Sequence, residues 1–469
     1  MVYLILVLYI GVTFFGSLVG TRKTNTPEGY FLANRNLNTL SLFFTILATN
    51  FSAFYFLGFA GEAYRVGYSY YIVMALGTSL ACLSFYVIGS PVWKLGKEKG
   101  YITPSELVLD QTGSRTLSRL FAIIMILFTF PYLALQIVGA GYILESITNG
   151  EIPYFTGATI LTVVTIVYVL LGGMHSVAKT DLKQGMIMVV LMFAAVFSIA
   201  QSLGGLTEAN KAVFEIQPEL FSRVGKGNTY TPQKWFSLLF FWFFCIPMFP
   251  QLFMRFYVAR NLDNLKKSAL LYAFIPLVIS LLPVIIGVLS HLTFPNLEGK
   301  EADQILPMML LEHSSKWFAA LVMTGALAAF MSTLDSQLLA LSTIASRDFS
   351  SSNSPEVSLK RQVNIGRVWV LFFALVGLGI AYQPFDTIFD MGKLAFAGLS
   401  ILFPSAFMIL RGGKIHSLWH VGSILIGELV LLAFYYGSIP LKWTYGFEAF
   451  IPALAASSII MLIGKLTNK

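Results

Sequence analysis

The chain has 469 residues, of which 56% are hydrophobic and 12% are charged, and its mean hydropathy is +0.74. Roughly a quarter of the residues of a soluble protein are charged, so this composition excludes a soluble globular protein. The formal net charge of +8 suits basic loops at an anionic lipid surface and gives no support to nucleic-acid binding.

Thirteen apolar stretches are near or above the roughly 20 residues that a helix needs to cross the hydrocarbon core. We therefore predict an all-α polytopic membrane protein with 13 transmembrane helices. The stretch at the start has no basic beginning and is followed by Arg22 and Lys23, the reverse of a signal peptide, so we expect it to be retained. The thirteen spans are residues 1–20, 40–62, 69–93, 117–147, 153–171, 185–204, 235–257, 269–292, 317–346, 366–382, 385–410, 417–436 and 447–462.

Lysine and arginine are divided unevenly between the connections. Alternate connections hold 22 of the 31 basic residues, the other connections hold 8, and Lys393 lies inside a span. Because basic residues next to short loops resist translocation, the richer connections are expected in the cytoplasm. This pattern predicts an N-terminus outside and a C-terminus inside, in a multi-pass protein of the cell membrane, such as a bacterial inner membrane.

The connections leave no room for a catalytic domain. The longest ones, residues 206–234 and 347–364, are too short for one, and the five histidines all lie near loops or span ends. Cys82 and Cys245 fall within spans, which predicts neither a disulfide framework nor a metal centre. We therefore expect a protein that is not an enzyme and that has no cofactor.

The second and seventh spans carry helix breakers at their centres. Residues 48–53 include four poor helix formers, and Pro247 and Pro250 interrupt the seventh span. In secondary transporters, interrupted helices at corresponding positions of two repeats mark the substrate and ion site. A simple kink, or a polar side chain bonded to a neighbouring helix, would explain either break alone.

The paired breaks divide the chain into five parts. Spans 2–6 and 7–11 form two repeats, and an odd repeat length places them in opposite membrane orientations. The predicted parts are a leading helix and cytoplasmic segment (1–38), a first inverted repeat (39–205), an extracellular loop (206–234), a second inverted repeat (235–412) and two trailing helices (413–469).

The ninth span contains the densest group of polar side chains. Ser332, Thr333, Asp335 and Gln337 fall within two helical turns, and all of them offer hard oxygen donors of the kind that an alkali cation accepts. The pattern predicts one wall of a sodium site. In the alternative, the hydroxyls bond carbonyls one turn earlier and Asp335 faces cytoplasmic water.

Four segments carry a resemblance to one family. Residues 30–37 resemble its segment after the first span, residues 172–184 its signature of paired glycines, Thr-Asp and Gln, Pro250-Gln251 with Arg255 the end of its seventh span, and residues 332–339 its sodium-binding helix. On these motifs the chain resembles the sodium:solute symporter family, which includes the proline, pantothenate, sugar, sialic acid and iodide carriers. The resemblance covers nearly the whole length.

The resemblance implies a core of ten helices in a 5+5 inverted repeat, with one leading helix and two trailing ones. It implies a sodium site made by the carbonyls of Ala48, Phe51 and Ala329 and the hydroxyls of Ser332 and Thr333. It also implies a second sodium or a sodium exit route at Asp181, faced by Asp335 and Ser336. Some relatives have an acidic residue where this chain has Asn50.

The solute pocket is expected beside the two breaks and on the facing spans. Gln136 is the strongest single candidate, because an uncharged amide in the middle of a span needs a partner. Most of the aromatic candidates, taken singly, are equally well explained as packing. The candidates are Asn50, Ser52, Phe54, Tyr55, Tyr132, Gln136, Trp242, Ile246, Gln251 and Lys393.

Lys393 bears on the charge of the solute. A carboxylate solute would pair with this lysine, whereas Asp390 or Asp386 could pair with it within the helix. We predict a sodium-coupled symporter that imports a small organic anion of the monocarboxylate or pantothenate type by alternating access. The alternatives are a proline, amino-acid or sugar symporter, and a solute-binding membrane sensor without coupled transport.

Overall fold

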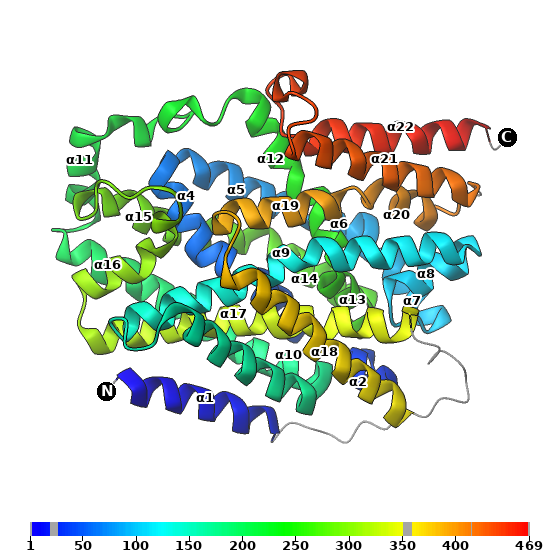
Figure 1. Ribbon diagram of the computed structural model, residues 1–469, viewed down its shortest axis with the longest axis horizontal. Helices are drawn as coiled ribbons and strands as arrows, with labels where there is room; N and C mark the ends of the chain where they lie inside the picture. Colours follow the sequence, from blue (N-terminus) through cyan, green and yellow to red (C-terminus); the bar gives the residue numbers. More distant parts are fainter. Residues whose placement is uncertain (1, 19–26, 350–358, 414, 468–469) are drawn as a thin grey trace.

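The computed structural model describes residues 2–18, 27–349, 359–413 and 415–467. These parts of the chain are helical, and an isolated bridge between Leu37 and Ala259 is the one β pairing within them. The long helices run roughly along one axis, and the two termini lie at opposite ends of the bundle (Figure 1). An odd number of crossings requires such a placement of the termini. Which end faces the cytoplasm stays a prediction, and Arg22 and Lys23 lie outside the described residues.

Nine helices are long and apolar enough to cross a membrane, and two bent helix pairs raise this number to eleven if each pair is one span. The bent pairs are Thr39–Asn50 with Phe54–Val66 and Pro232–Met248 with Pro250–Val258. Two shorter apolar helices, Val2–Val12 and Tyr154–Leu170, coincide with the remaining predicted spans, so the number thirteen stays a prediction. The nine are Ser69–Lys99, Arg115–Ile147, Thr180–Ser202, Leu262–Leu292, Lys316–Phe349, Arg361–Tyr382, Ile388–Leu410, Ser417–Tyr435 and Phe450–Thr467.

The first half of the chain forms the leading helix, the first bent pair and the helices that follow it. Thr103 caps α8 in a reciprocal capping box with Glu106, which fixes the start of that surface helix. The elements are α1 (Val2–Leu18), α2 (Pro27–Leu32), α3 (Thr39–Asn50), the π-helix η2 (Phe54–Gly58), α4 (Phe59–Val66), α5 (Ser69–Leu80), α6 (Cys82–Ser84), α7 (Ser90–Lys99), α8 (Pro104–Thr112), α9 (Arg115–Ile147) and α10 (Tyr154–Ser202).

The second half of the chain also contains a bent helix pair, and it ends in two trailing helices. Its elements are α11 (Leu206–Ile216), α12 (Pro232–Cys245), the 3-10 turn η6 (Ile246–Met248), α13 (Pro250–Val258), α14 (Leu262–Ile279), α15 (Leu281–Leu289), the 3-10 turn η8 (Gly299–Gln304), α16 (Ile305–His313), α17 (Lys316–Ile344), α18 (Leu359–Tyr382), α19 (Ile388–Ser400), α20 (Phe403–Leu410), α21 (Ser417–Tyr435) and α22 (Phe450–Thr467).

Helix α10 contains both apolar segments, Tyr154–Leu170 and Thr180–Ser202, and differs from the prediction only in that the expected connection at residues 172–184 is helical. The helix is continuous over 49 residues. A straight helix of this length would extend about 70 Å, more than twice the thickness of a hydrocarbon core. Residues 172–184 contain no proline, so no residue type in this segment forbids the helix from continuing.

Helix α17 lies at the centre of the bundle. Within its most apolar window 83% of the residues are buried, against 28% in the window of α18. Small residues such as Gly325, Ala326 and Ala329 let neighbouring backbones approach this helix closely. The polar side chains in its second half are therefore enclosed by protein: Ser332, Thr333, Asp335 and Ser336 are all fully buried.

Candidate ion and solute sites

The first bend lies where the poor helix formers predict it. Helix α3 ends at Asn50, Phe51 takes an extended conformation (φ −81°, ψ 90°), and the chain resumes with a 60° change of direction. The Ala53 N–H donates to Oε1 of Gln136 over 2.8 Å, and Nε2 of Gln136 donates to the Tyr132 carbonyl over 3.0 Å. The Gln136 amide thus satisfies a buried backbone group that the break leaves without a helical partner.

The second bend lies at the two prolines. Helix α12 passes into the short turn η6, Phe249 is extended (φ −61°, ψ 124°), and α13 starts at Pro250 with a 63° change of direction. Pro250 stands at the first helical position, where its missing N–H costs nothing. Both predicted breaks are confirmed.

Oxygen atoms from both halves of the chain converge at the first break. The Ser332 hydroxyl lies 2.9 Å from the Ala48 carbonyl and 2.9 Å from the Ala329 carbonyl. The Thr333 hydroxyl lies 3.3 Å from the Ala48 carbonyl and 3.2 Å from both the Thr49 and the Ala329 carbonyls. We call the carbonyls of Ala48 and Ala329 with the hydroxyls of Ser332 and Thr333 the oxygen cluster.

The chemistry of the oxygen cluster fits a monovalent cation. Its donors are carbonyl and hydroxyl oxygens, which are hard ligands, and they include no carboxylate. Phe51, the fifth residue that the resemblance implies, follows α3 directly in the non-helical turn, where its carbonyl is outside the helical ladder. Helical back-bonding of the hydroxyls to Ala329 is present as well, and it coexists with contacts across to α3.

A second polar group, the charged cluster, lies one turn further along α17. Nη2 of Arg255 donates to Oδ2 of Asp181 over 3.2 Å and to the Ser336 hydroxyl over 2.7 Å. The Thr45 hydroxyl donates to the same Asp181 oxygen over 2.5 Å and accepts from Nε of Arg255 over 3.1 Å. Asp335 accepts from the Tyr168 hydroxyl over 2.7 Å and from Ser336 over 3.0 Å.

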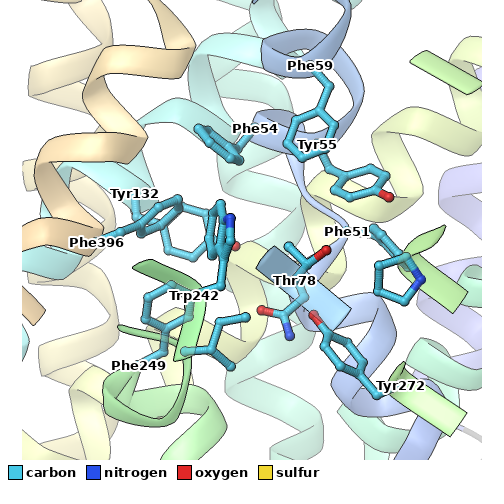
Figure 2. A pocket seen from close by; sticks show the side chains of 13 residues that line it. Phe51, Phe54, Tyr55, Phe59, Thr78, Tyr132, Trp242, Phe249, Tyr272 and Phe396 are labelled. Carbon is cyan, nitrogen blue, oxygen red and sulfur yellow. The ribbon is translucent and has the colours of Figure 1, made fainter. Parts of the chain in front are cut away.

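The cavity at the two bends, which we call the central cavity, is lined mostly by aromatic side chains. Phe396 lies at the middle of the aromatic wall, with ring centroids of Tyr132, Phe249 and Trp242 at 4.8, 5.0 and 5.3 Å (Figure 2). The volume is about 20 Å³, close to that of one water molecule, so these rings must move before a solute enters. The lining residues are Asn50, Phe51, Phe54, Tyr55, Phe59, Thr78, Tyr132, Trp242, Ile246, Phe249, Tyr272, Pro276 and Phe396.

Six of the ten predicted solute residues line the central cavity: Asn50, Phe54, Tyr55, Tyr132, Trp242 and Ile246. Ser52, Gln136, Gln251 and Lys393 do not. Gln136 was the strongest single candidate, and its amide is instead occupied by backbone groups at the first bend. The other lining residues were not predicted, because nothing in the sequence separates a span residue that lines a cavity from one that only packs. They are Phe59, Thr78, Phe249, Tyr272, Pro276 and Phe396.

Lys393 lies in a different cavity, which we call the peripheral chamber. This chamber of about 440 Å³ is bounded by α12, α19, α21 and the connection before α22. Nζ of Lys393 pairs with Oε2 of Glu448 over 2.7 Å. Lys393 therefore pairs with Glu448 rather than with Asp390, whose carboxylate accepts from Thr387 over 2.7 Å, and Lys393 does not line the central cavity. A contact between Lys393 and the solute stays a prediction. Adjacent residues of one helix, Phe241 and Trp242, line the chamber and the central cavity respectively.

A third polar group, formed by Asp303, Arg65 and Glu62, joins η8 and α4 to the start of α19. Asp303 of η8 accepts from Nη2 of Arg65 over 3.1 Å and from the Ile388 N–H over 2.8 Å. Burial raises the pKa of Asp303 to about 7, and the positive charge of Arg65 limits the rise. Glu62 completes the group, since it pairs with Arg65 over 3.2 Å and accepts from the Tyr230 hydroxyl over 3.2 Å.

The two bent helices, the oxygen cluster where α3 meets α17 and the aromatic cavity at the two bends define a membrane transporter of the broken-helix type. The model of the sodium:solute symporter family matches residues 30–410. The chain therefore belongs to the sodium:solute symporter family, and it is a transporter rather than an enzyme, located in the plasma membrane as a multi-pass protein. Sodium is the coupling ion of that family.

Relatives with known names resemble the chain over most of its length. The sodium/pantothenate symporter of Haemophilus influenzae is 25% identical over 443 residues, which are 93% of this chain and 89% of that protein. The osmoregulated proline transporter of Bacillus subtilis is 24% identical over 480 residues, which are 99% of this chain and 95% of that protein. A sodium-coupled sialic acid symporter, solved in a substrate-bound outward-open state, shares the fold with a TM-score of 0.81 at 16% identity, covering 99% of this chain and 96% of its own.

Proposed function

We propose that this protein imports a small organic acid together with sodium by alternating access. The observation that carries the proposal is the meeting of Ser332 and Thr333 with the Ala48 carbonyl, at the point where α3 breaks. Sodium would be held there by the carbonyls of Ala48, Phe51 and Ala329 and by the two hydroxyls. Each sodium ion that enters contributes about 2.3 kcal/mol per 100 mV of inside-negative potential, before any concentration term.

The first helix break would couple sodium binding to solute binding, because it borders both the oxygen cluster and the central cavity. Phe51 contributes its ring to the central cavity wall, and it directly follows the helix that carries Ala48 and Thr49. A sodium ion that orders this turn would fix the cavity wall in the shape that binds solute. Ion and solute then stabilise the same state, and each raises the affinity for the other.

The donors at the central cavity support a carboxylate on the solute. Nε1 of Trp242 is buried and has no hydrogen-bond partner among the described residues. Phe249, which lines the cavity, is the N-cap residue of α13, so the N-terminus of this helix lies at the wall. Pro250 has no N–H and the Leu252 N–H donates to the Phe249 carbonyl over 3.0 Å, which leaves the Gln251 N–H as the backbone donor at this end. A helix N-terminus and an indole N–H both favour an anionic acceptor. The likeness to pantothenate symporters agrees with a solute of this class.

A zwitterion such as proline is the second candidate. Nine of the thirteen lining residues are aromatic, and those that line the cavity in the described structure carry no formal charge. Aromatic faces attract an ammonium group, while the same two donors would receive the carboxylate. The likeness to proline transporters supports this candidate.

Purified protein in liposomes with an imposed sodium gradient tests the proposal. Labelled pantothenate, short monocarboxylates, proline and a sugar would be offered singly, with sodium or potassium outside. Accumulation of an acid above its equilibrium level, with sodium alone, is the expected result. Sodium-dependent uptake of proline but of no acid would select the second candidate. Solute binding without accumulation would contradict the proposal and indicate a sensor.

A further inference from the structure

The peripheral chamber lies where four helices begin or end. Helix α12 begins at Pro232, α19 begins at Ile388, α21 ends at Tyr435 and α22 begins at Phe450, and all four helices contribute residues to the chamber wall. The ends of spanning helices lie near the interface between membrane and water. The segment from the end of α21 to α22 carries exposed aromatic side chains of the kind that gather at this level: Tyr435, Tyr436, Trp443 and Tyr445. The chamber is therefore at the level of the lipid headgroups.

The two trailing helices place the chamber next to lipid. Helices α21 and α22 pack on each other at the edge of the bundle (Figure 1). In their most apolar windows 39% and 33% of the residues are buried, against 83% in the window of α17. Exposed apolar surface of this extent faces the hydrocarbon in a membrane protein. Leu441, which lines the chamber, is itself 66% exposed. The surrounding lipid is thus within reach of the chamber.

The wall of the chamber changes from charged to apolar with depth. Lys234 and Asp390 lie in the first turns of α12 and α19, and Asp386 and Glu448 lie just before α19 and α22. A phospholipid has the same order, because its charged headgroup is followed by hydrocarbon chains. One or two turns further into the helices the wall consists of Leu238, Phe241, Leu394, Ala397 and Leu431.

The charged side chains leave complementary groups unused. Lys393 pairs with Glu448 over 2.7 Å. Lys234, Asp386 and Asp390 take part in none of the ion pairs within the described ranges of the chain. Two cations and three anions line the chamber, so the lining has a formal net charge of −1. A ligand with one anionic and one cationic group matches it, because a lysine binds phosphate and carboxylates accept hydrogen bonds from an ammonium group.

We propose that the peripheral chamber binds one phospholipid whose headgroup carries a primary ammonium, as in phosphatidylethanolamine. Lys234 holds the phosphate, Asp386 and Asp390 hold the ammonium, and an acyl chain lies against the apolar wall. The volume of about 440 Å³ falls within the roughly 300–1,000 Å³ of ligand pockets. A soluble zwitterion would satisfy the charged end and leave the apolar wall without an occupant.

The bound lipid would connect two helices that border the central cavity. Lys234 belongs to α12 and the two aspartates lie at the start of α19, so the headgroup bridges these segments. Phe241 lines the chamber, and the next residue, Trp242, lines the central cavity. The lipid site is therefore on the opposite side of α12 from the proposed solute site, and it goes beyond the proposed function.

The lipid preference of the wild-type protein tests the proposal. Delipidated full-length protein in detergent would be mixed with phosphatidylethanolamine, phosphatidylcholine or phosphatidylglycerol, and native mass spectrometry would count the bound lipids. One phosphatidylethanolamine should bind about tenfold more tightly than the other two, because choline has no N–H and the glycerol headgroup has no cation. Equal affinity for all three lipids would overturn the proposal. The measurement needs neither sodium nor transport, so its failure and that of the proposed function are distinguishable.

Substitutions test the two halves of the headgroup. Lys234→Gln should weaken the binding of all three lipids about tenfold, because each of them has a phosphate. Asp386→Asn combined with Asp390→Asn should reduce the preference for phosphatidylethanolamine over phosphatidylcholine to less than about twofold. Full preference in this double variant would contradict the proposal. If a variant fails to fold, the preference of the wild-type protein still decides.

Lys316→Gln is the matched control for Lys234→Gln. Lys316 is the first residue of α17, so it also lies at the start of a spanning helix, and it does not line the chamber. Lipid binding should be unchanged in this control. An equal loss of binding in the control would attribute the effect to the net charge of the protein and count against the proposal.

A soluble competitor distinguishes a lipid from a free zwitterion. Phosphoethanolamine carries the headgroup without the acyl chains, so displacing the bound lipid should need at least about 100-fold more phosphoethanolamine than phosphatidylethanolamine. Displacement by phosphoethanolamine or by proline at the same concentration as the lipid would show that the apolar wall adds nothing. That result would overturn the proposal and identify the chamber as a site for a soluble zwitterion.

Discussion

The central cavity and the peripheral chamber lie on either side of α12, and they differ in the charge of the residues that line them. The residues that line the central cavity carry no formal charge, and the rings close it to about 20 Å³. The chamber has about 440 Å³ and is lined by Lys234, Asp386, Asp390, Lys393 and Glu448 among apolar residues. One residue of α12, Phe241, faces the chamber, and the next, Trp242, faces the cavity.

This difference agrees with the proposed function, in which the ion and the solute bind reversibly to groups that carry partial charges. Full charges bind each other strongly and are costly to part when buried. Carbonyls, hydroxyls, an indole N–H and helix termini carry partial charges, so they can accept an ion and a solute and then release them. In this protein the carbonyls and hydroxyls of the oxygen cluster lie at the first break, whereas Lys393 and Glu448 pair with each other in the peripheral chamber.

The largest expected effect comes from removing ligands at the oxygen cluster. A Ser332→Ala, Thr333→Ala double variant loses two of the five proposed sodium ligands, so half-maximal uptake should require about 100-fold more sodium. Sodium-dependent uptake in liposomes measures this. Ser342→Ala with Thr343→Ala is the matched control, because those hydroxyls bond the Leu339 carbonyl within α17. Normal sodium dependence in the first variant would end the case for this site.

A smaller effect is expected from the indole donor of the central cavity. Trp242→Phe keeps an aromatic ring and removes Nε1, so the KM for a carboxylate solute should rise about tenfold at unchanged sodium affinity. Trp235→Phe on the same helix is the control, since Trp235 does not line the cavity. An unchanged KM for the acid would mean that the solute carboxylate does not bind Nε1 of Trp242, and it would favour a solute held by the aromatic rings alone.

The peripheral chamber should respond little. Lys393→Gln and Glu448→Gln each remove one partner of a half-buried pair, which contributes on the order of 1 kcal/mol, and neither touches the central cavity. We expect the solute KM to change by less than about twofold in either variant. Uptake kinetics with an acid and with proline measure this. A large rise in the KM for the acid alone, in Lys393→Gln, would place the lysine on the solute path and break the contrast between the two cavities.

The smallest effect on transport is expected at Asp303, where the readout is stability against pH. Its pKa is raised to about 7 in the folded protein, above the unfolded value of about 3.9. The folded state therefore binds the proton more tightly, and the contribution to the free energy of unfolding is full below about pH 4 and is lost as the pH rises through about 7. Thermal unfolding in detergent across this range should show the decline, and Asp303→Asn should flatten it. An equal slope in both proteins would contradict the assignment.

The two helix breaks were predictable because their causes are local. Proline lacks an N–H wherever it stands, and the residues around Asn50 are poor helix formers in any context. The hydroxyl pair of α17 was predictable for a similar reason, since two polar side chains within a turn of an apolar span stand out. The hydrogen bond from the Ala53 N–H to Gln136 was not predictable, because the two residues are 83 positions apart in the sequence.

The amino-acid sequence by itself determined that this is a helical membrane protein, where two of its helices break, and which hydroxyls face the first break. Each of these follows from hydropathy or from the conformational preferences of neighbouring residues. Only the tertiary structure decided that Ser332 meets the Ala48 carbonyl 284 positions away, that Lys393 pairs with Glu448, and that Arg255 stands between Asp181 and Ser336. The physical reason is that a buried polar group takes the partner that packing brings within reach, and packing joins segments whose separation along the chain carries no signal of their contact.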